Sequence, residues 1–97
     1  MKITWSPLAL ERVAEIGSYI AEDNALAAEK WVHRVFERVG QLGTFPESGR
    51  QIPETSRPEI REIVWGNYRI IYRLDTRQVS ILTVRHARQR LPIEDLE

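Results

Sequence analysis

The side chains best suited to chemistry lie in the second half of the chain, and they are arginines and one histidine. Residues 50–90 carry nine basic groups, all arginine, against four acidic ones. Guanidinium groups bind phosphate and carboxylate bidentately and stay charged at physiological pH. Gathered on one face they could hold an anionic partner such as a nucleic acid backbone, although arginine stems also cover ordinary solvated strands. The candidates on or beside the expected strands are Arg61, Arg69, Arg73, Arg85, His86, Arg88 and Arg90.

His86 is the candidate general base at that end of the expected sheet, because imidazole titrates near physiological pH. With such a base, the arginines could stabilise the charge of a cleaved phosphodiester. A histidine that ends a strand can equally be structural and satisfied by a neighbour. The sequence contains no phosphate-binding glycine loop, no Ser–His–Asp set and no metal-ligand cluster, so we expect no cofactor and no metal site.

Length and composition place the chain among small soluble proteins. Its 97 residues suffice for one domain, taken as residues 1–97, and the formal net charge is zero. It has no cysteine, which excludes disulfides and thiolate metal sites. No apolar run approaches the roughly 20 residues that a membrane span needs, and no signal-peptide core follows the first residue. We therefore expect a cytoplasmic protein that makes no membrane contact.

Hydrophobic spacing predicts the element order β-α-α-β-β-β. A short strand over 2–5 should precede a helix from about 7 to 21, which Ser6-Pro7 should start. A second helix should run from Ala25 to Leu42 and pack against the first as an antiparallel hairpin. A loop rich in proline follows, and strands are expected over 60–65, 68–74 and 79–85. The fold class is thus α+β.

Strand alternation assigns the faces of the expected sheet. The set containing Tyr68, Ile70 and Tyr72 is mostly apolar, so we expect the helices to cover it. Arg69 and Arg73 should then lie on an open, solvated face. The expected core is Ile16, Trp31, Val35 and Val39 from the helices with Ile63, Ile70, Tyr72, Leu82 and Val84 from the sheet.

Several short motifs, taken in order, are similar to those of RelE/ParE toxins from type II toxin–antitoxin systems. They include Trp5-Ser6-Pro7-Leu8-Ala9 at the start, Gly49-Arg50 in the loop, and Asn67-Tyr68-Arg69-Ile70-Ile71-Tyr72-Arg73 in the central strand. The run Val79–His86 completes the pattern. The resemblance covers nearly the whole chain and implies a helical hairpin packed on a small antiparallel sheet.

The resemblance also implies a partner and one of two activities. Members are neutralised by a cognate antitoxin, whose acidic groups we expect to meet Arg69, Arg73 or Arg85. RelE-like members cut mRNA on the ribosome, whereas ParE-like members block DNA gyrase. In a nuclease, the catalytic candidates would be Arg61, Arg69 and His86.

Two absences favour the ParE-like side of this family. No lysine follows Lys30 and no tyrosine follows His86, so the catalytic residues of RelE-like members are poorly matched. We therefore expect a toxin that arrests growth by inhibiting DNA gyrase. A ribosome-dependent mRNA endonuclease and a non-toxic interaction domain are the alternatives.

Overall fold

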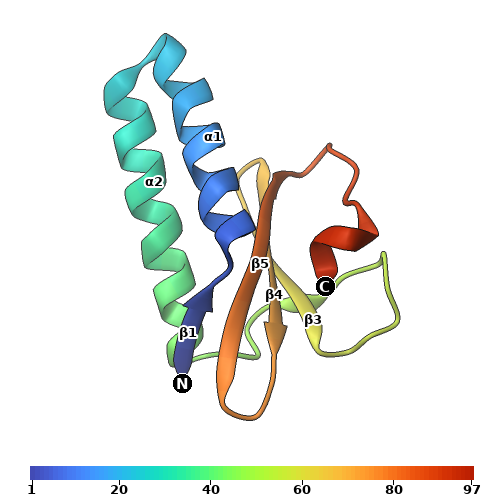
Figure 1. The fold of residues 1–97 in the computed structure, drawn as a ribbon. Coiled ribbons are helices and arrows are strands. Elements are labelled where there is room, and N and C mark those ends of the chain that lie inside the picture. The colour runs from blue at the N-terminus through green and yellow to red at the C-terminus, as the bar shows by residue number, and fades with distance from the viewer.

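The computed structural model describes residues 1–97 and confirms the expected α+β fold, with the helices on one side of a mixed sheet (Figure 1). Short 3-10 turns at Gln41–Gly43 and Ile93–Leu96 supplement the regular elements. One strand, β2, was not expected and interrupts the long loop. The elements are β1 (Lys2–Trp5), α1 (Pro7–Asp23), α2 (Ala25–Gly40), β2 (Arg50–Gln51), β3 (Ile60–Trp65), β4 (Tyr68–Leu74) and β5 (Gln78–His86).

Both helices begin where the sequence predicts. The Ser6 hydroxyl accepts a hydrogen bond from the backbone N–H of Ala9, and proline occupies the first position of α1. Asn24 ends α1 and caps α2, since its side chain accepts from the Ala27 N–H at 3.0 Å. One residue therefore stops one helix and starts the next, which folds the pair into a tight hairpin. Neither helix is both long and apolar enough to cross a membrane.

The sheet has the strand order β1-β5-β4-β3-β2. All neighbouring strands are antiparallel except β1, which pairs in parallel with β5 from Lys2 opposite Gln78 to Trp5 opposite Ile81. The first strand, expected over residues 2–5, is thus an edge strand. A two-residue turn joins β3 to β4, and Gly66 supplies the positive φ of 57° that such a turn needs.

The sheet buries side chains on both faces, which corrects the expectation of an open face. The helix-facing core contains twelve buried residues, among them Trp31, Val35, Val39, Ile70 and Tyr72. Ile16 packs against this core and is partly buried. Across the sheet, the loop after α2 and the C-terminal segment cover a second apolar cluster. Its members are Ile52, Ile60, Ile71, Leu82, Leu91 and Leu96.

Leu82 belongs to this second cluster, so its expected place beneath the helices was wrong. The register of β5 against β4 passes from Thr83 opposite Ile71 to Ile81 opposite Tyr72. Leu82 is therefore an extra residue, a β-bulge, and the alternation of β5 changes phase there. Ile81 precedes the bulge and Val84 follows it, and both face the helices.

Candidate functional site

Arg69 is the centre of a buried ion network, not a solvated arginine. Its side chain is only 10% exposed and contacts the carboxylates of Glu62 and Glu54. Glu54 binds it bidentately, with the second contact at 2.8 Å. Strand parity had correctly placed Arg69 away from the helices. The expectation of solvation failed because the loop carrying Glu54 folds over that face.

The charges of this network stabilise one another. The hydrogen bond from Arg69 holds the pKa of Glu54 below its ordinary value, against the opposing effect of desolvation. The bonds from Glu54 and Glu62 raise the pKa of Arg69, which keeps it fully charged. Arg50 of β2 adds a contact to Glu62 at 2.7 Å. The positive charge of Arg69 is therefore already matched inside the molecule, which leaves little for an external anion.

Arg61 lies on the other face of the sheet, beside Tyr72 of β4. Its guanidinium donates to the Gly49 carbonyl at 2.8 Å. The Tyr72 hydroxyl donates to the Pro46 carbonyl at 2.8 Å and accepts from the Gly49 N–H at 3.0 Å. Burial raises the pKa of Tyr72, so the phenol keeps the proton that it donates. Arg61 and Tyr72 thus hold the loop that precedes β2.

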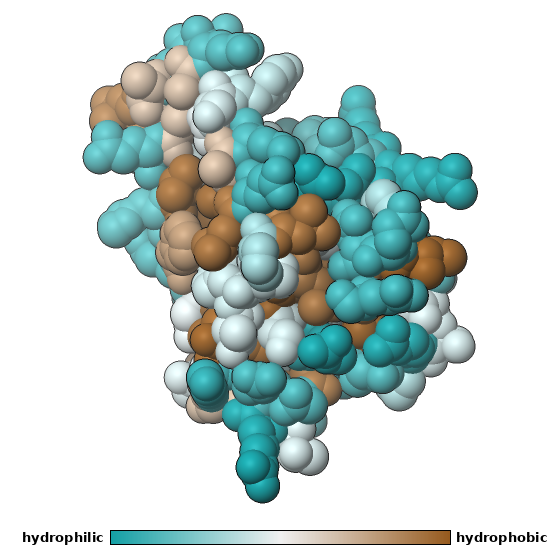
Figure 2. Space-filling model, in the orientation of Figure 1, coloured by the Kyte–Doolittle hydropathy of each residue, from teal (hydrophilic) through white to brown (hydrophobic).

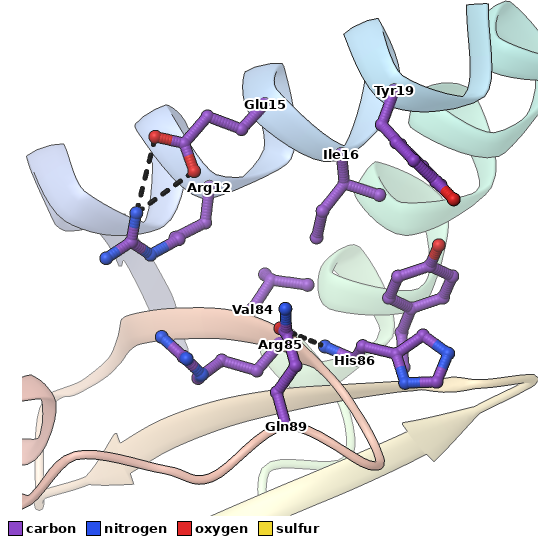
Figure 3. Close-up of a pocket in the computed structure, with 9 residues that line it drawn as sticks. Arg12, Glu15, Ile16, Tyr19, Val84, Arg85, His86 and Gln89 are labelled. Atoms are coloured by element: carbon purple, nitrogen blue, oxygen red, sulfur yellow. Dashed lines mark hydrogen bonds and ion pairs between the residues drawn. The ribbon is translucent and has the colours of Figure 1, made fainter.

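His86 lines a polar cavity of about 580 Å³ between α1 and the end of β5 (Figure 3). Its Nδ1 accepts a hydrogen bond from the Arg88 N–H at 3.1 Å, so in the neutral ring the proton sits on Nε2. Tyr68 meets the imidazole edge-on, with ring centroids 5.4 Å apart. Burial, and then the proximity of Tyr19, raises the pKa of Tyr68. This cavity therefore offers hydrogen-bond donors at neutral pH.

The helical wall of the cavity comes from α1. Arg12 and Glu15 form an ion pair at 3.0 Å, and Ile16 and Tyr19 point down toward β5 (Figure 3). Tyr19 is 71% exposed, an unusual exposure for a large aromatic residue. The composition of the cavity, aromatic rings beside a charged pair, suits a docked side chain better than a reacting phosphodiester.

The three candidate catalytic residues do not meet. Arg61 and His86 share the helix-side face, but Arg61 lies opposite Tyr72 and His86 opposite Tyr68, at the other end of β4. Arg69 occupies the reverse face. Arg61 and Arg69 therefore cannot act together with His86, and the arginines that line its cavity are Arg12 and Arg85.

The remaining arginines divide into paired and free groups. Arg85 contacts Asp95 at 3.3 Å and is 17% exposed. Arg73 is half-buried, and Arg88 and Arg90 are exposed in the segment after β5; none of these three forms an ion pair. No three His, Cys, Asp or Glu side chains are grouped closely enough to hold a metal ion. Arg88 and Arg90 therefore place unpaired positive charge just after β5, beside the His86 cavity, whereas Arg73 lies opposite Ser80 near the start of β5.

The sequence analysis did not identify the acidic partners of Arg69 or the α1 residues that line the His86 cavity. The burial of Glu62 could have been suspected, because a charged residue inside an apolar strand needs a partner. Glu54 gave no such signal, since a loop glutamate is ordinarily solvated. Tyr19 was not among the candidate site residues, yet it is 71% exposed and lines the cavity.

Comparisons with known proteins agree with one another. The family model described as "ParE toxin of type II toxin-antitoxin system, parDE" matches residues 3–91. A protein of Sinorhizobium fredii (strain NBRC 101917 / NGR234) named "Putative toxin Y4kP" is 42% identical over 95 residues, covering 94% of this chain and 93% of the relative.

One solved structure, titled "Chromosomal ParDE TA system from P. aeruginosa", contains a chain that superposes with a TM-score of 0.74. The two chains are 20% identical, and the match covers 89% of this chain and 95% of that one. At this identity the match establishes a shared fold.

Proposed function

Because this chain belongs to the ParE toxin family of type II toxin–antitoxin systems, we propose that it arrests growth by binding and inhibiting DNA gyrase, with no chemical step of its own. Gyrase acts in the cytoplasm, so the same proposal places the protein there. One observation carries the preference for binding over cleavage. Arg69 is bound by Glu54 and Glu62 on the face of the sheet opposite His86, so the nuclease candidates form no common site.

The free arginines at the end of β5 are the proposed contacts with gyrase. Arg88 and Arg90 are exposed and carry no ion pair, and they adjoin the cavity lined by Tyr68 and His86. Exposed cations next to an aromatic cavity are typical of interaction surfaces, where arginine and tyrosine contribute much of the binding energy.

A gyrase supercoiling assay tests this proposal directly. Purified protein should inhibit supercoiling, and Arg88→Gln with Arg90→Gln should weaken the inhibition. Arg77→Gln is the matched control, because Arg77 is also exposed but lies in the β4–β5 turn at the far end of β5. Unimpaired supercoiling at every protein concentration would exclude gyrase as the target.

A second assay separates the alternatives. The polar cavity around His86 is the feature that favours a ribosome-dependent endonuclease, since the imidazole lines a space large enough for a substrate group and only its Nδ1 is engaged in a hydrogen bond. Purified protein added to ribosomes with bound mRNA should leave the message intact if the proposal holds. Cleavage there would establish the nuclease. Inactivity in both assays would leave the non-toxic interaction domain.

We further propose that a cognate antitoxin neutralises the protein by covering apolar surface on the helical hairpin. Leu10, Tyr19 and Leu26 are each about half exposed or more, and small residues of α1 line a shallow apolar groove against α2. Figure 2 shows hydrophobic surface gathered over the hairpin and along its border with the sheet. A flexible antitoxin segment that folds on binding could bury this surface.

For the electrostatic part of antitoxin binding, we propose a different set of arginines from the one expected from the sequence. Arg69 and Arg85 already contact carboxylates of this chain, so Arg73, Arg88 and Arg90 are the proposed partners of an acidic antitoxin. Replacing all three by glutamine should weaken the complex and reduce its dependence on salt. An unchanged salt dependence in that variant would refute this assignment.

A further inference from the structure

The C-terminal segment, residues 91–97, lies across the sheet face that the helices leave uncovered (Figure 1). Leu91 and Leu96 are 6% and 3% exposed and belong to the second apolar cluster, with Ile71 and Leu82 of the sheet. Asp95 is 9% exposed and contacts Arg85 of β5. The segment therefore covers this strip of the sheet with two leucines and one carboxylate, and we call the strip beneath it the groove.

Few polar interactions hold this segment in place. Its one side-chain link to the sheet is the Asp95–Arg85 contact at 3.3 Å. No backbone hydrogen bond joins residues 91–97 to a strand, and the bond from the Asp95 N–H to the Pro92 carbonyl stays inside the segment. Burial of two leucines is the main favourable contribution, and it is opposed by the entropy of ordering seven residues. The segment can consequently detach without unfolding the sheet.

The segment also leaves polar atoms of the groove unsatisfied. Thr83 is completely buried and pairs with Ile71, so it faces the second cluster, and its hydroxyl has no hydrogen-bond partner. The Nε of Arg85 is buried and unpartnered as well. Buried polar groups without partners are costly, and native structures rarely keep them. An occupant that supplied acceptors to both atoms would fit the groove better than this segment does.

We propose that this groove is a peptide-binding site for a partner protein, and that residues 91–97 occupy it in the free chain. The partner segment has the same chemistry as the occupant: an apolar residue, then an acidic residue followed by an apolar one about one helical turn later. Its carboxylate pairs with Arg85, and its further acceptors meet Thr83. Arg69 takes no part, because its charge is matched by Glu54 and Glu62. This proposal holds whichever target the toxin has.

A labelled peptide with the sequence of residues 91–97 is the probe, and fluorescence anisotropy is the measurement. The full chain with Leu91→Ala and Leu96→Ala should bind it about tenfold more tightly than the unmodified chain, because release of the intramolecular segment raises the fraction of open groove. Ile93→Ala is the matched control within the same segment, since Ile93 is 67% exposed and should change nothing. Adding Arg85→Gln to the double variant should abolish the gain.

Three outcomes would overturn the proposal. One is equal affinity for the unmodified chain and for the double variant shown to be folded by circular dichroism. Another is equal binding of a peptide with the same residues in shuffled order. A third is a dimer of the unmodified chain that the peptide dissociates, which would make a second copy the occupant. If the double variant fails to fold, excess peptide is added to the ¹⁵N-labelled unmodified chain. The resonances of residues 91–97 should then shift to the positions of the free peptide. Unchanged resonances would refute displacement.

Discussion

Replacing Arg69 by alanine should destabilise the fold severely, although the residue resembles a surface arginine in the sequence. The substitution leaves the Glu62 carboxylate, whose side chain is 1% exposed, without its buried partner. Removing one member of a buried ion pair costs about 3–5 kcal/mol, because the remaining charge stays desolvated. Arg50 still contacts Glu62, but its own side chain is 72% exposed and the solvent screens it. We therefore expect a loss near the lower limit, about 3 kcal/mol.

Urea denaturation followed by circular dichroism measures this loss. The control is Arg50→Ala, which removes the exposed contact to the same carboxylate and should cost about 1 kcal/mol or less. A compensated variant, Arg69→Met with Glu62→Leu, should regain most of the stability, because replacing a buried pair by apolar residues is often neutral. A cost below about 1 kcal/mol for Arg69→Ala, with an unchanged denaturant slope, would refute the view that this network holds the loop on the sheet.

Three further predictions concern pH, the loop and the histidine. In the folded state the hydrogen bond from Arg69 lowers the pKa of Glu54 from its ordinary 4.5. The ionised Glu54 therefore stabilises the fold above pH 4.5, and this contribution is lost as the pH falls below 4.5. Glu54→Gln should therefore flatten the pH dependence of the urea midpoint below 4.5, and an identical slope in both proteins would contradict this. Gly49→Ala would drive a methyl group into the Tyr72 hydroxyl and should lower stability by about 1–3 kcal/mol in thermal unfolding, whereas unchanged melting would show that the loop can shift. His86→Gln should retain most growth arrest after induction; a drop in mRNA cleavage by a factor of about 10²–10⁴ would instead identify His86 as an acid or base.

Local signals in the sequence were sufficient for the elements and for one face of the sheet. Ser6 and Asn24 are residue types that favour helix starts, and the side chain of each accepts a backbone N–H at the start of its helix. Gly66 marks the tight turn between β3 and β4. The 3-4 repeat of α2 correctly placed Trp31, Val35 and Val39 in the core. Each of these features depends on neighbours a few residues away, which is why sequence patterns record them.

The face of the sheet away from the helices depends on contacts between residues far apart in the sequence, which no local pattern records. Glu54 meets Arg69 from a loop fifteen positions earlier, and Asp95 meets Arg85 from the C-terminal segment. Both acidic residues look solvated in a sequence, because loops and termini usually are. The bulge at Leu82 also shifted the alternation of β5, so parity counted along the strand failed there. The fold was thus predictable, whereas the surroundings of its arginines were not.

The parallel pairing of β1 with β5 delays completion of the sheet while the chain is synthesised on the ribosome. Lys2 pairs with Gln78 and Trp5 pairs with Ile81, so β1 can join the sheet only after β5 has been synthesised. At a synthesis rate of about 5–20 residues per second, the interval is roughly 4–15 s. During that time the helical hairpin can form from its local contacts, but its apolar stripe has no sheet to cover it. Every newly made molecule therefore passes through a period of seconds in which the apolar stripe of the hairpin is exposed to any partner that can bind it.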